Sequence, residues 1–496
     1  MAAGKGKRPS ASKAARQAKP LTPGKAALFV LITVSLPFIF LGILETGLRA
    51  ADYGGSLAAF DAPEVMNGAY RVPGTNVGRR YFPREKFPPT PPGDAFLVEK
   101  PANSMRIFVL GESSAAGFPY PANGTFSRVL RDVLSDVLPG DTVEVVNMGM
   151  AATNSYTIAD LAGDIIDQRP DAVMIYGGHN EYYGALGAGS TESLGSFPSL
   201  VRLYLRLQHL KTFLLFRNTV SGVLTAVRGG RSATDIEGDA TRMESVVGDQ
   251  RIVFGGDAYQ RGVRQYEGNL RDAIERFRSA GIPVFLASTP SNLRDLPPFG
   301  PSIVPPDSAA TIVFDSARTI LAAGDSSEAG VLFGRARDLD VVRFRAPSEF
   351  MNVVKRVSTE TGATYVGAEE LISSQSQYGI PGADLFLEHV HPNQRGYVIL
   401  ARAFYDAIAA KQFLGRAADV SRFAGWDAYA GRMRLTELDH RIAHHTVRTV
   451  TTRWPFLPVS RQLDYRGTYR PVDFLDSVAQ RIARRNVVGA GEGDAW

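Results

Sequence analysis

The sequence contains no cysteine among its 496 residues. Disulfide bonds, thiolate metal ligands, a cysteine nucleophile and a lipid-modified cysteine anchor are therefore all excluded. The hydrophobic fraction of 44% is sufficient, in a chain of this length, to bury a substantial core. The sequence therefore describes a folded protein of one or more domains rather than a disordered chain.

Acidic residues are absent from the first 25 residues. This segment carries seven Lys or Arg side chains, so that a net charge of +5 for the whole chain leaves −2 for the remainder. A nucleic-acid-binding protein needs a basic face on its folded domain, whereas this excess of positive charge belongs to a tail of low complexity. We therefore do not expect nucleic-acid binding.

Charged residues of either sign are missing from residues 26–44, AALFVLITVSLPFIFLGIL. A helix of this length spans roughly 28 Å, close to the ~30 Å hydrocarbon core of a bilayer. A buried core helix would normally show a polar stripe, and a cleaved signal peptide would be followed by a small-residue cleavage site. We interpret residues 26–46 as an uncleaved signal anchor that crosses the inner, cytoplasmic membrane once. The positive-inside rule then keeps residues 1–25 in the cytoplasm and places everything after about residue 47 outside, which is the periplasm if the cell is a Gram-negative bacterium.

Strands alternate with helices from residue 105 onward. Short apolar runs predict five strands, and apolar residues at helical spacing predict the helices between them. Such an order is typical of a parallel sheet with right-handed crossovers and helices on both faces, whose ligands bind beyond the carboxyl ends of the strands. The predicted strands are 105–110, 143–147, 172–176, 282–288 and 363–367, and the predicted helices are 125–138, 155–168, 258–281 and 348–361.

Composition divides the chain into five regions around this core. They are a basic cytoplasmic tail at 1–25, the transmembrane anchor at 26–46, a Pro- and Gly-rich lead-in at 47–104, the α/β domain at 105–412 with insertions at 185–257 and 296–347, and a helical extension at 413–496.

The insertions carry their own patterns. Residues 200–220 place Leu203, Leu207, Leu210 and Leu214 on one face of a predicted helix, which fits core packing, a lid or a helix on the membrane surface. Residues 228–256, rich in glycine and charge, predict a mobile loop. Residues 315–347 predict a pair of helices joined at GDSSEA.

Polar turns follow the predicted strands at one edge of the sheet. Acyl transfer by serine needs a hydroxyl, an imidazole to take its proton, a carboxylate to orient the imidazole, and donors for the developing oxyanion. These turns supply all four kinds of group. They are GESSAAG at 111–117, NMGMAATNS at 147–155, GGHNEYYG at 177–184 and LFLEHVHPNQRGY at 385–397.

These motifs, in this order, resemble the SGNH/GDSL hydrolases. The family's GDSxxxG block is matched by Gly111–Gly117 with Glu112 in place of aspartate, its GxND block by Gly178–Glu181, again with glutamate, and its DxxHP block by Glu388–Pro392. The resemblance covers roughly residues 105–410 and implies a three-layer α/β/α, flavodoxin-like fold. The stretches RFRAP and LFLEHVHPNQRGY also resemble membrane-anchored bacterial members of the family.

The resemblance implies a catalytic triad. It makes Ser113 the nucleophile, ahead of its neighbour Ser114, His391 the base and Glu388 the acid that orients the base. Glutamate adds one methylene to the family's aspartate but keeps its charge and acceptor role.

An oxyanion hole follows from the same blocks. Its donors would be the N–H of Ser113, the N–H of Ala152 and the side-chain amide of Asn180. The family has glycine where this chain has Ala152, and Gly149 is the alternative at that position. The cost of alanine depends on whether the site requires a positive φ.

Further residues could line the pocket without taking part in the chemistry. They are Gly178, His179, Asn292, Arg294 and His389, and Arg294 could either meet an anionic substrate or pair with Asp295. No ligand spacing predicts a metal site, and the implied chemistry requires no cofactor.

The function implied is ester hydrolysis by a serine-dependent esterase, on an acylated carbohydrate or lipid outside the cytoplasm. Two alternatives stand beside it. The membrane anchor suggests an O-acyltransferase that modifies an exported polysaccharide, and the glutamates and the missing glycine suggest an inactive scaffold or binding module. The sequence specifies neither the acyl group and alcohol of the substrate nor the oligomeric state.

Overall fold

The computed structural model describes residues 22–83, 85, 87–190, 198–227, 247, 251–300, 309–458, 461–463 and 465–488. The chain divides into two compact units. One consists of Met1–Gly54 with Leu210–Gly222, and the other of Gly55–His209 with Val223–Trp496.

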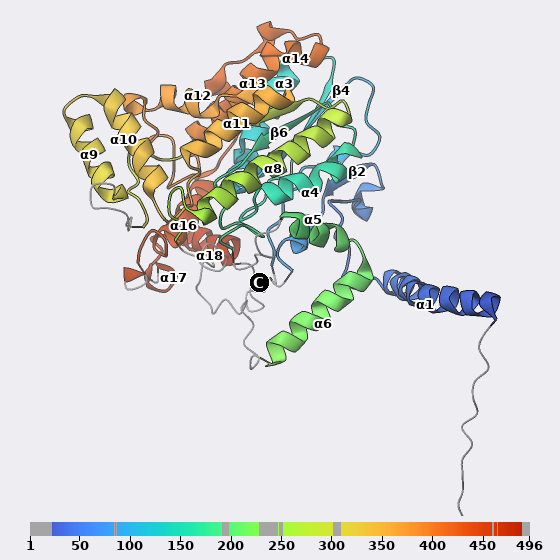
Figure 1. Ribbon diagram of the computed structural model, residues 1–496. Coiled ribbons are helices and arrows are strands. Elements are labelled where there is room, and N and C mark those ends of the chain that lie inside the picture. The colour runs from blue at the N-terminus through green and yellow to red at the C-terminus, as the bar shows by residue number, and fades with distance from the viewer. Residues whose placement is uncertain are drawn as a thin grey trace, which may run out of the picture. The chain divides into compact units, whose positions relative to one another are not determined.

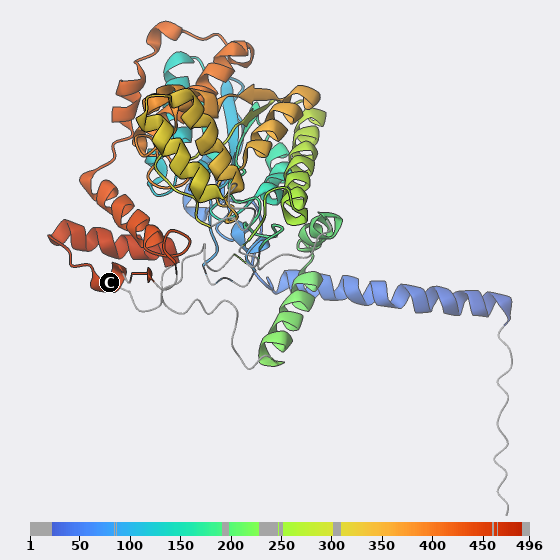
Figure 2. The same cartoon turned by 60° about the vertical axis from the view of Figure 1, so that its left-hand side comes forward.

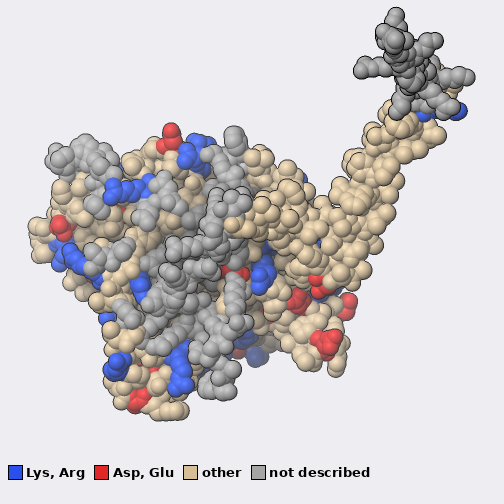
Figure 3. Space-filling model, turned by 90° about the horizontal axis from the view of Figure 1, so that it is seen from below, with Lys and Arg blue, Asp and Glu red and all other residues tan. Residues whose placement is uncertain are grey.

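The first unit contains helix α1 (Pro23–Ala50) and most of helix α6 (Lys211–Val227). Helix α1 has a mean hydropathy of 2.6 over its most apolar 18-residue window, and none of that window is buried. Along most of its length α1 shows neither acidic nor basic side chains in Figure 3. Length and composition therefore allow α1 to span a membrane. It extends beyond the predicted segment 26–46 at both ends.

The second unit is built on five parallel strands. They lie in the order β5-β4-β6-β7-β8, which is the 2-1-3-4-5 order of flavodoxin-like folds when the strands are numbered within this sheet. The strands are β4 (Ser104–Gly111), β5 (Thr142–Asn147), β6 (Ala172–Tyr176), β7 (Val284–Ala287) and β8 (Thr364–Val366).

Both faces of this sheet are covered by helices, because alternate apolar residues of each strand point to opposite sides. On β4, Phe108 and Leu110 enter one core, whereas Ile107 and Val109 enter the other. The first core is closed by α4 (Ser155–Ile166), α8 (Asp257–Ser279) and α11 (Ser348–Thr361), and the second by α3 (Phe126–Val137) and α13 (Gln394–Ala410) (Figures 1 and 2). The prediction of a three-layer α/β/α fold with a parallel five-stranded sheet is confirmed.

The single helix expected across residues 200–220 is wrong. The structure has two helices, α5 (Pro198–Leu207) and α6, because the Glu45 carboxylate accepts the backbone N–H groups of Lys211 (3.0 Å) and Thr212 (2.8 Å) and so caps a new helix start. The four leucines consequently share no buried face: Leu203 and Leu210 are exposed, and α5 buries Val201 and Leu205 instead. Most of the glycine-rich stretch 228–256 lies outside the described residues.

The second insertion does form a helix pair, α9 (Ala310–Ala322) and α10 (Ser326–Leu339). The two helices pack through Phe314 and Phe333, whose ring centroids are 5.1 Å apart. The pair begins five residues before the predicted start at 315, and residues 340–347, expected to continue α10, form an irregular buried segment instead. The chain leaves the helix there because Asp340 caps other backbone groups, accepting from the N–H of Phe299 and of Gly300.

The lead-in contains an antiparallel sheet that the sequence did not predict. Its strands are β1 (Phe60–Asp61), β2 (Tyr70–Pro73) and β3 (Phe96–Leu97), with 3₁₀ turns η1 (Glu64–Met66) and η2 (Val77–Arg80) between them. Strands this short have no detectable period. The rings of Phe60 and Phe96 pack on Phe108 of β4, at 5.6 and 5.5 Å, so the lead-in is attached to the main core.

Short elements and the C-terminal helices complete the second unit. Helix α16 begins with a capping box formed by Thr436 and Asp439. Within the described residues, the remaining elements are α2 (Ser113–Ala116), η3 (Ala122–Gly124), α12 (Ala368–Gln375), η5 (Gln377–Gly379), α14 (Gln412–Gly415), η6 (Val420–Arg422), α15 (Trp426–Arg432), α16 (Glu437–Thr451), α17 (Tyr465–Thr468) and α18 (Phe474–Val488).

Candidate active site

Ser113 is the first residue of helix α2, two residues beyond the end of β4. Gly111 ends that strand so close to the carbonyl group of Tyr176 on β6 that a Cβ would collide with it. The close approach turns the chain sharply at the carboxyl edge of the sheet, and the Ser113 side chain is left half-buried rather than enclosed. A serine at this place can meet a ligand.

A series of hydrogen bonds joins Ser113 to two side chains from the turn before α13. Ser113 Oγ lies 2.7 Å from Nε2 of His391, 278 residues away in the sequence. The other ring nitrogen of His391, Nδ1, is hydrogen-bonded to Oε1 of Glu388, which also accepts the His391 backbone N–H at 2.9 Å. With Nδ1 donating to Glu388, Nε2 has a lone pair directed at the serine hydroxyl.

The turn that carries Glu388 and His391 is fixed by its own backbone. The N–H of Leu387 donates to the carbonyl of His391 at 2.9 Å, and Phe386 pairs with Pro392 in an isolated bridge. Asn393 then caps helix α13, since its Oδ1 accepts the N–H of Gly396 at 3.0 Å. The spacing of three residues between acid and imidazole is therefore held by local structure.

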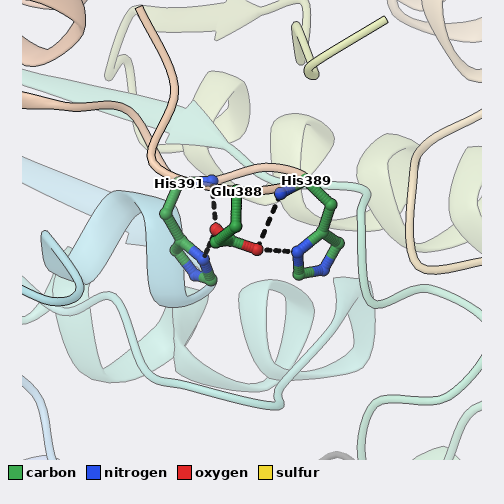
Figure 4. Close-up of side chains that lie close together, drawn as sticks. All are labelled: Glu388, His389 and His391. Carbon is green, nitrogen blue, oxygen red and sulfur yellow. Dashed lines mark hydrogen bonds and ion pairs between the residues drawn. The ribbon is translucent and has the colours of Figure 1, made fainter. Parts of the chain in front are cut away.

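His389 lies on the other side of the same carboxylate (Figure 4). Its backbone N–H donates to Glu388 Oε2 at 2.8 Å, and its ring Nδ1 is hydrogen-bonded to the same oxygen. Donor atoms of Glu388, His389 and His391 lie within 4.8 Å of one another, the one such grouping that the described residues show as able to hold a metal ion. These atoms are already hydrogen-bonded to each other, so a metal would have to break the link between His391 and Glu388.

Burial controls the charge of the histidines. It lowers the pKa of His391 below the ordinary value for histidine, and the imidazole is therefore neutral at neutral pH. Burial also lowers the pKa of His389 well below its usual range, and the neighbouring His391, His179 and Arg345 side chains act in the same direction. A neutral His391 is the form that can accept a proton.

Ser114 and Gly149 have structural roles instead. The Ser114 side chain is buried and its Oγ donates to the carbonyl of Val390 at 3.1 Å. The Gly149 N–H donates to Oδ1 of Asn147 at 2.9 Å, and a Cβ on Gly149 would lie 2.6 Å from the backbone nitrogen of Ala116 in α2. Neither the Ser114 hydroxyl nor the Gly149 N–H is free for a ligand.

Ala152 adopts a φ of +58°, the left-handed conformation that glycine tolerates better than alanine. Its carbonyl accepts the N–H of Ala185 at 2.9 Å, whereas no acceptor within the described segments takes its own N–H. This position therefore does need a positive φ, and the chain adopts it without the glycine that the resemblance leads one to expect.

Glu112 connects the end of β4 to the loop after β6. Its Oε1 accepts the backbone N–H of Gly178 at 2.9 Å and its Oε2 accepts that of Asn180 at 3.0 Å. Burial raises the pKa of Glu112 to about 8; the N–H of Asn180 opposes this rise, and the nearby charge of Glu181 adds to it. Because the Asn180 backbone is held in this way, only its half-buried side-chain amide remains for a ligand.

Glu181 anchors the same loop from the other side. Its carboxylate accepts the backbone N–H of Ser155 (3.0 Å), the Ser155 hydroxyl (2.7 Å) and Nε2 of Gln265 (2.5 Å). Burial raises its pKa to about 7. Glu112 and Glu181 thus position backbone rather than face a ligand.

His179, two residues before Glu181 in the sequence, is almost completely buried. Its Nδ1 accepts the N–H of Ala346 at 3.2 Å, which makes Nε2 the protonated nitrogen, and Nε2 has no hydrogen-bond partner. Burial lowers the pKa of His179 to about 3. Gly178 lies beside the hydroxyl of Tyr266, 3.1 Å from the place a Cβ would take.

Asn292 and Arg294 do not join the serine. The Asn292 N–H donates to the carbonyl of His389 at 2.9 Å, which attaches the loop after β7 to the turn with Glu388. Arg294 pairs with Asp295 at 2.8 Å and Asp384 at 2.7 Å. Its guanidinium is thereby neutralised, as the salt-bridge interpretation predicts.

Aromatic residues that the sequence analysis did not single out surround the histidines. The ring of Phe118 lies 4.5 Å from that of His391, and Phe299, Phe344 and Phe456 surround the ring of His389. Phe118 follows helix α2, Phe299 and Phe344 belong to the insertion at 296–347, and Phe456 belongs to the C-terminal extension. No local motif marks such residues, because only tertiary packing brings them together.

No protein-family model matches the sequence, and no curated protein does. Solved structures with a similar chain course include a catalytic mutant of Axe2, an acetylxylan esterase from Geobacillus stearothermophilus (17% identity, 62% of this chain and 96% of that chain, TM-score 0.31). A second is the acetyl xylan esterase AlAXEase (11% identity, 61% of this chain and 100% of that chain, TM-score 0.31). A third is a putative GDSL-like lipase from Parabacteroides merdae (13% identity, 63% of this chain and 98% of that chain, TM-score 0.32). The strand order and the side chains themselves define the class: a doubly wound α/β protein with a hydrogen-bonded serine, histidine and glutamate at the carboxyl edge of its sheet.

Proposed function

We propose that this protein is a serine-dependent carboxylic ester hydrolase. The observation that carries the proposal is the hydrogen-bonded series from Ser113 Oγ through the two ring nitrogens of His391 to Glu388. Imidazole between a hydroxyl and a carboxylate is the arrangement that activates serine for attack on an acyl carbon. The partly exposed hydroxyl and the neutral imidazole suit this role.

The reaction would proceed in two halves. His391 Nε2 takes the Ser113 proton as Oγ attacks the ester carbonyl, and then returns it to the departing alcohol, which leaves an acyl-serine. Water, deprotonated by the same nitrogen, attacks the acyl-serine; the serine regains a proton and the carboxylic acid leaves. Glu388 stabilises the imidazolium that forms in each half by accepting from Nδ1.

The tetrahedral oxyanion needs donors that are not used within the protein. We assign the N–H of Ser113, the N–H of Ala152 and the side-chain amide of Asn180 to this role. Support comes from the free Ala152 N–H and from Glu112, which holds the Asn180 backbone and leaves only the side chain available. One such donor is typically worth about 10²- to 10³-fold in kcat.

We further propose that α1 is a signal anchor, with the N-terminus in the cytoplasm and the hydrolase unit outside. The substrate would then be an acylated carbohydrate or lipid beyond the inner membrane. If a sugar hydroxyl replaces water in the second half-reaction, the same site is an O-acyltransferase. Transfer to glycan in excess of hydrolysis of 4-nitrophenyl acetate would favour the transferase.

The test is labelling of the full chain in detergent with a fluorophosphonate, together with hydrolysis of 4-nitrophenyl acetate. We expect the wild type to be labelled and active, and Ser113→Ala to lose both properties. Ser114→Ala is the matched control, since it removes a hydroxyl that bonds only to the Val390 carbonyl, and should keep both. If a folded wild type is not labelled, the protein is an inactive scaffold or binding module and the proposal is wrong. If Ser114→Ala loses labelling and activity while Ser113→Ala keeps them, Ser114 is the nucleophile.

Substitution Ala152→Gly tests the backbone assignment at the oxyanion hole. Glycine keeps the N–H and relieves the strain of φ +58°, so we expect kcat within about twofold of wild type and a free energy of unfolding changed by less than about 1 kcal/mol. Ala152→Val should lower both the melting temperature and kcat, because a β-branched residue is strained further in this conformation. If Ala152→Gly and Ala152→Val had the same kcat, the N–H at position 152 would have no role in the oxyanion hole.

A further inference from the structure

The Glu388 carboxylate is bound at both of its oxygens. Oε1 accepts the backbone N–H and ring Nδ1 of His391, and Oε2 accepts the backbone N–H and ring Nδ1 of His389 (Figure 4). Two imidazoles therefore hold one carboxylate from opposite sides. Rotation of the carboxylate away from His391 would break the bonds to His389 as well.

Glutamate needs such a restraint more than aspartate does. Its side chain has one additional rotatable bond, so more conformational freedom must be lost before its oxygen is fixed opposite His391. The mutual orientation of acid and base matters because small displacements of catalytic groups can cost about 10²-fold in rate. A second donor on Oε2 offsets the freedom that the extra methylene introduces.

His389 is itself held in an apolar enclosure. Its side chain is nearly inaccessible, and its ring centroid lies 5.6 Å from that of Phe299, 6.1 Å from Phe344 and 5.3 Å from Phe456, each in an edge-to-face arrangement. The low pKa that results from burial keeps the ring uncharged, so it acts as a hydrogen-bond donor through Nδ1 and not as a counter-ion. The charged or titratable groups around it are Glu388, His391, His179 and Arg345.

One wall of the enclosure comes from the segment after helix α16. Phe456 packs on Phe299 at 5.0 Å as well as on His389, and Trp454 packs on Phe344 at 5.7 Å. Behind them lies a cavity of about 470 Å³ that Phe299, Trp454 and Phe456 line. Phe456 therefore borders open space on one side and the histidine on the other.

We propose that His389 is a positioning residue that fixes Glu388 through Oε2, and that Phe456 of the C-terminal extension holds His389 in place. This inference rests on the proposed esterase function and deepens it, because it makes the extension part of the working site. Phe456 contacts His389, His389 bonds to Glu388, Glu388 bonds to His391, and His391 bonds to Ser113.

The test compares His389→Leu with His389→Asn in hydrolysis of 4-nitrophenyl acetate. Asparagine can place an amide N–H where Nδ1 lies, whereas leucine fills similar space without a donor. We expect His389→Leu to lower kcat about 10- to 100-fold with KM within twofold, and His389→Asn to retain kcat within about threefold.

A pH profile separates positioning from a general loss of structure. Without the donor on Oε2, Glu388 presents more negative charge to His391, which favours the imidazolium. The acid limb of kcat/KM should therefore move upward by roughly one pH unit in His389→Leu and stay in place in His389→Asn. A variant that is merely less stable would keep the wild-type limb.

Phe456→Ala tests the same inference with a second variant. Because Phe456 already borders a cavity, we expect its truncation to be tolerated by the fold. We expect a threefold to tenfold lower kcat with unchanged KM, and no further loss when it is combined with His389→Leu. The inference would be overturned if folded His389→Leu kept the wild-type kcat and the wild-type acid limb of kcat/KM. If His389→Leu does not fold, the same result in Phe456→Ala would overturn it. An inactive, unlabelled wild type would instead overturn the proposed function.

Discussion

Substitution of His391 by alanine is expected to lower kcat for 4-nitrophenyl acetate by roughly 10³- to 10⁶-fold and to abolish fluorophosphonate labelling. The reason is that Nε2 of His391, 2.7 Å from Ser113 Oγ, is the group that would remove the serine proton. Glu388 Oε1 would then lose the ring Nδ1 and keep only the backbone N–H of residue 391. The measurement is steady-state hydrolysis by the full chain in detergent, with circular dichroism to show that the variant is folded.

His444→Ala is the matched control for this variant. His444 is exposed on helix α16, so its removal should leave kcat within about twofold of wild type. If His391→Ala kept a tenth or more of wild-type kcat, His391 would not be the base and the proposed mechanism would be wrong.

Glu112→Gln is expected to lower kcat about 10²- to 10³-fold although Glu112 does not contact Ser113 Oγ. Both Glu112 oxygens accept backbone N–H groups, one from Gly178 and one from Asn180. Glutamine replaces one acceptor with a donor, so one buried N–H loses its partner at a cost of about 1–3 kcal/mol. The loop that carries the Asn180 amide would shift, and one oxyanion donor would be lost.

The comparison of single and double variants tests this explanation. Asn180→Ala should lower kcat by a similar factor, and Glu112→Gln should have little additional effect on kcat in the Asn180→Ala background. Independent, multiplying effects would show that Glu112 acts by another route. The melting temperature should fall in Glu112→Gln but change little in Asn180→Ala, because the half-buried Asn180 side chain makes no hydrogen bond within the described residues, whereas its backbone N–H donates to Glu112.

The main sheet could be predicted because its strands are covered on both faces. A strand such as β6, with five consecutive buried residues from Ala172 to Tyr176, reads as an uninterrupted apolar run. Strands β1 to β3 of the lead-in have two to four residues each, too few for any pattern. The break between α5 and α6 was missed because its cause, Glu45, lies far away in the sequence.

The site was predictable where its geometry is local. Glu388 and His391 are three residues apart in one turn, and Ser113 lies two residues beyond the end of a strand, so motif and topology together indicate their convergence. The choice between Gly149 and Ala152 depended on backbone angles and on the partner of each N–H, which a sequence does not display. The enclosure of His389 depended on Phe456, which only the packing of the C-terminal extension brings there.

The most direct test of the account is to locate the covalent adduct by tandem mass spectrometry after the full chain reacts with a fluorophosphonate. The peptide of interest contains both Ser113 and Ser114, so fragmentation has to distinguish the two neighbours. We expect one adduct, on Ser113 Oγ, that is absent from His391→Ala. An adduct on Ser114, or none on a folded wild type, would contradict it.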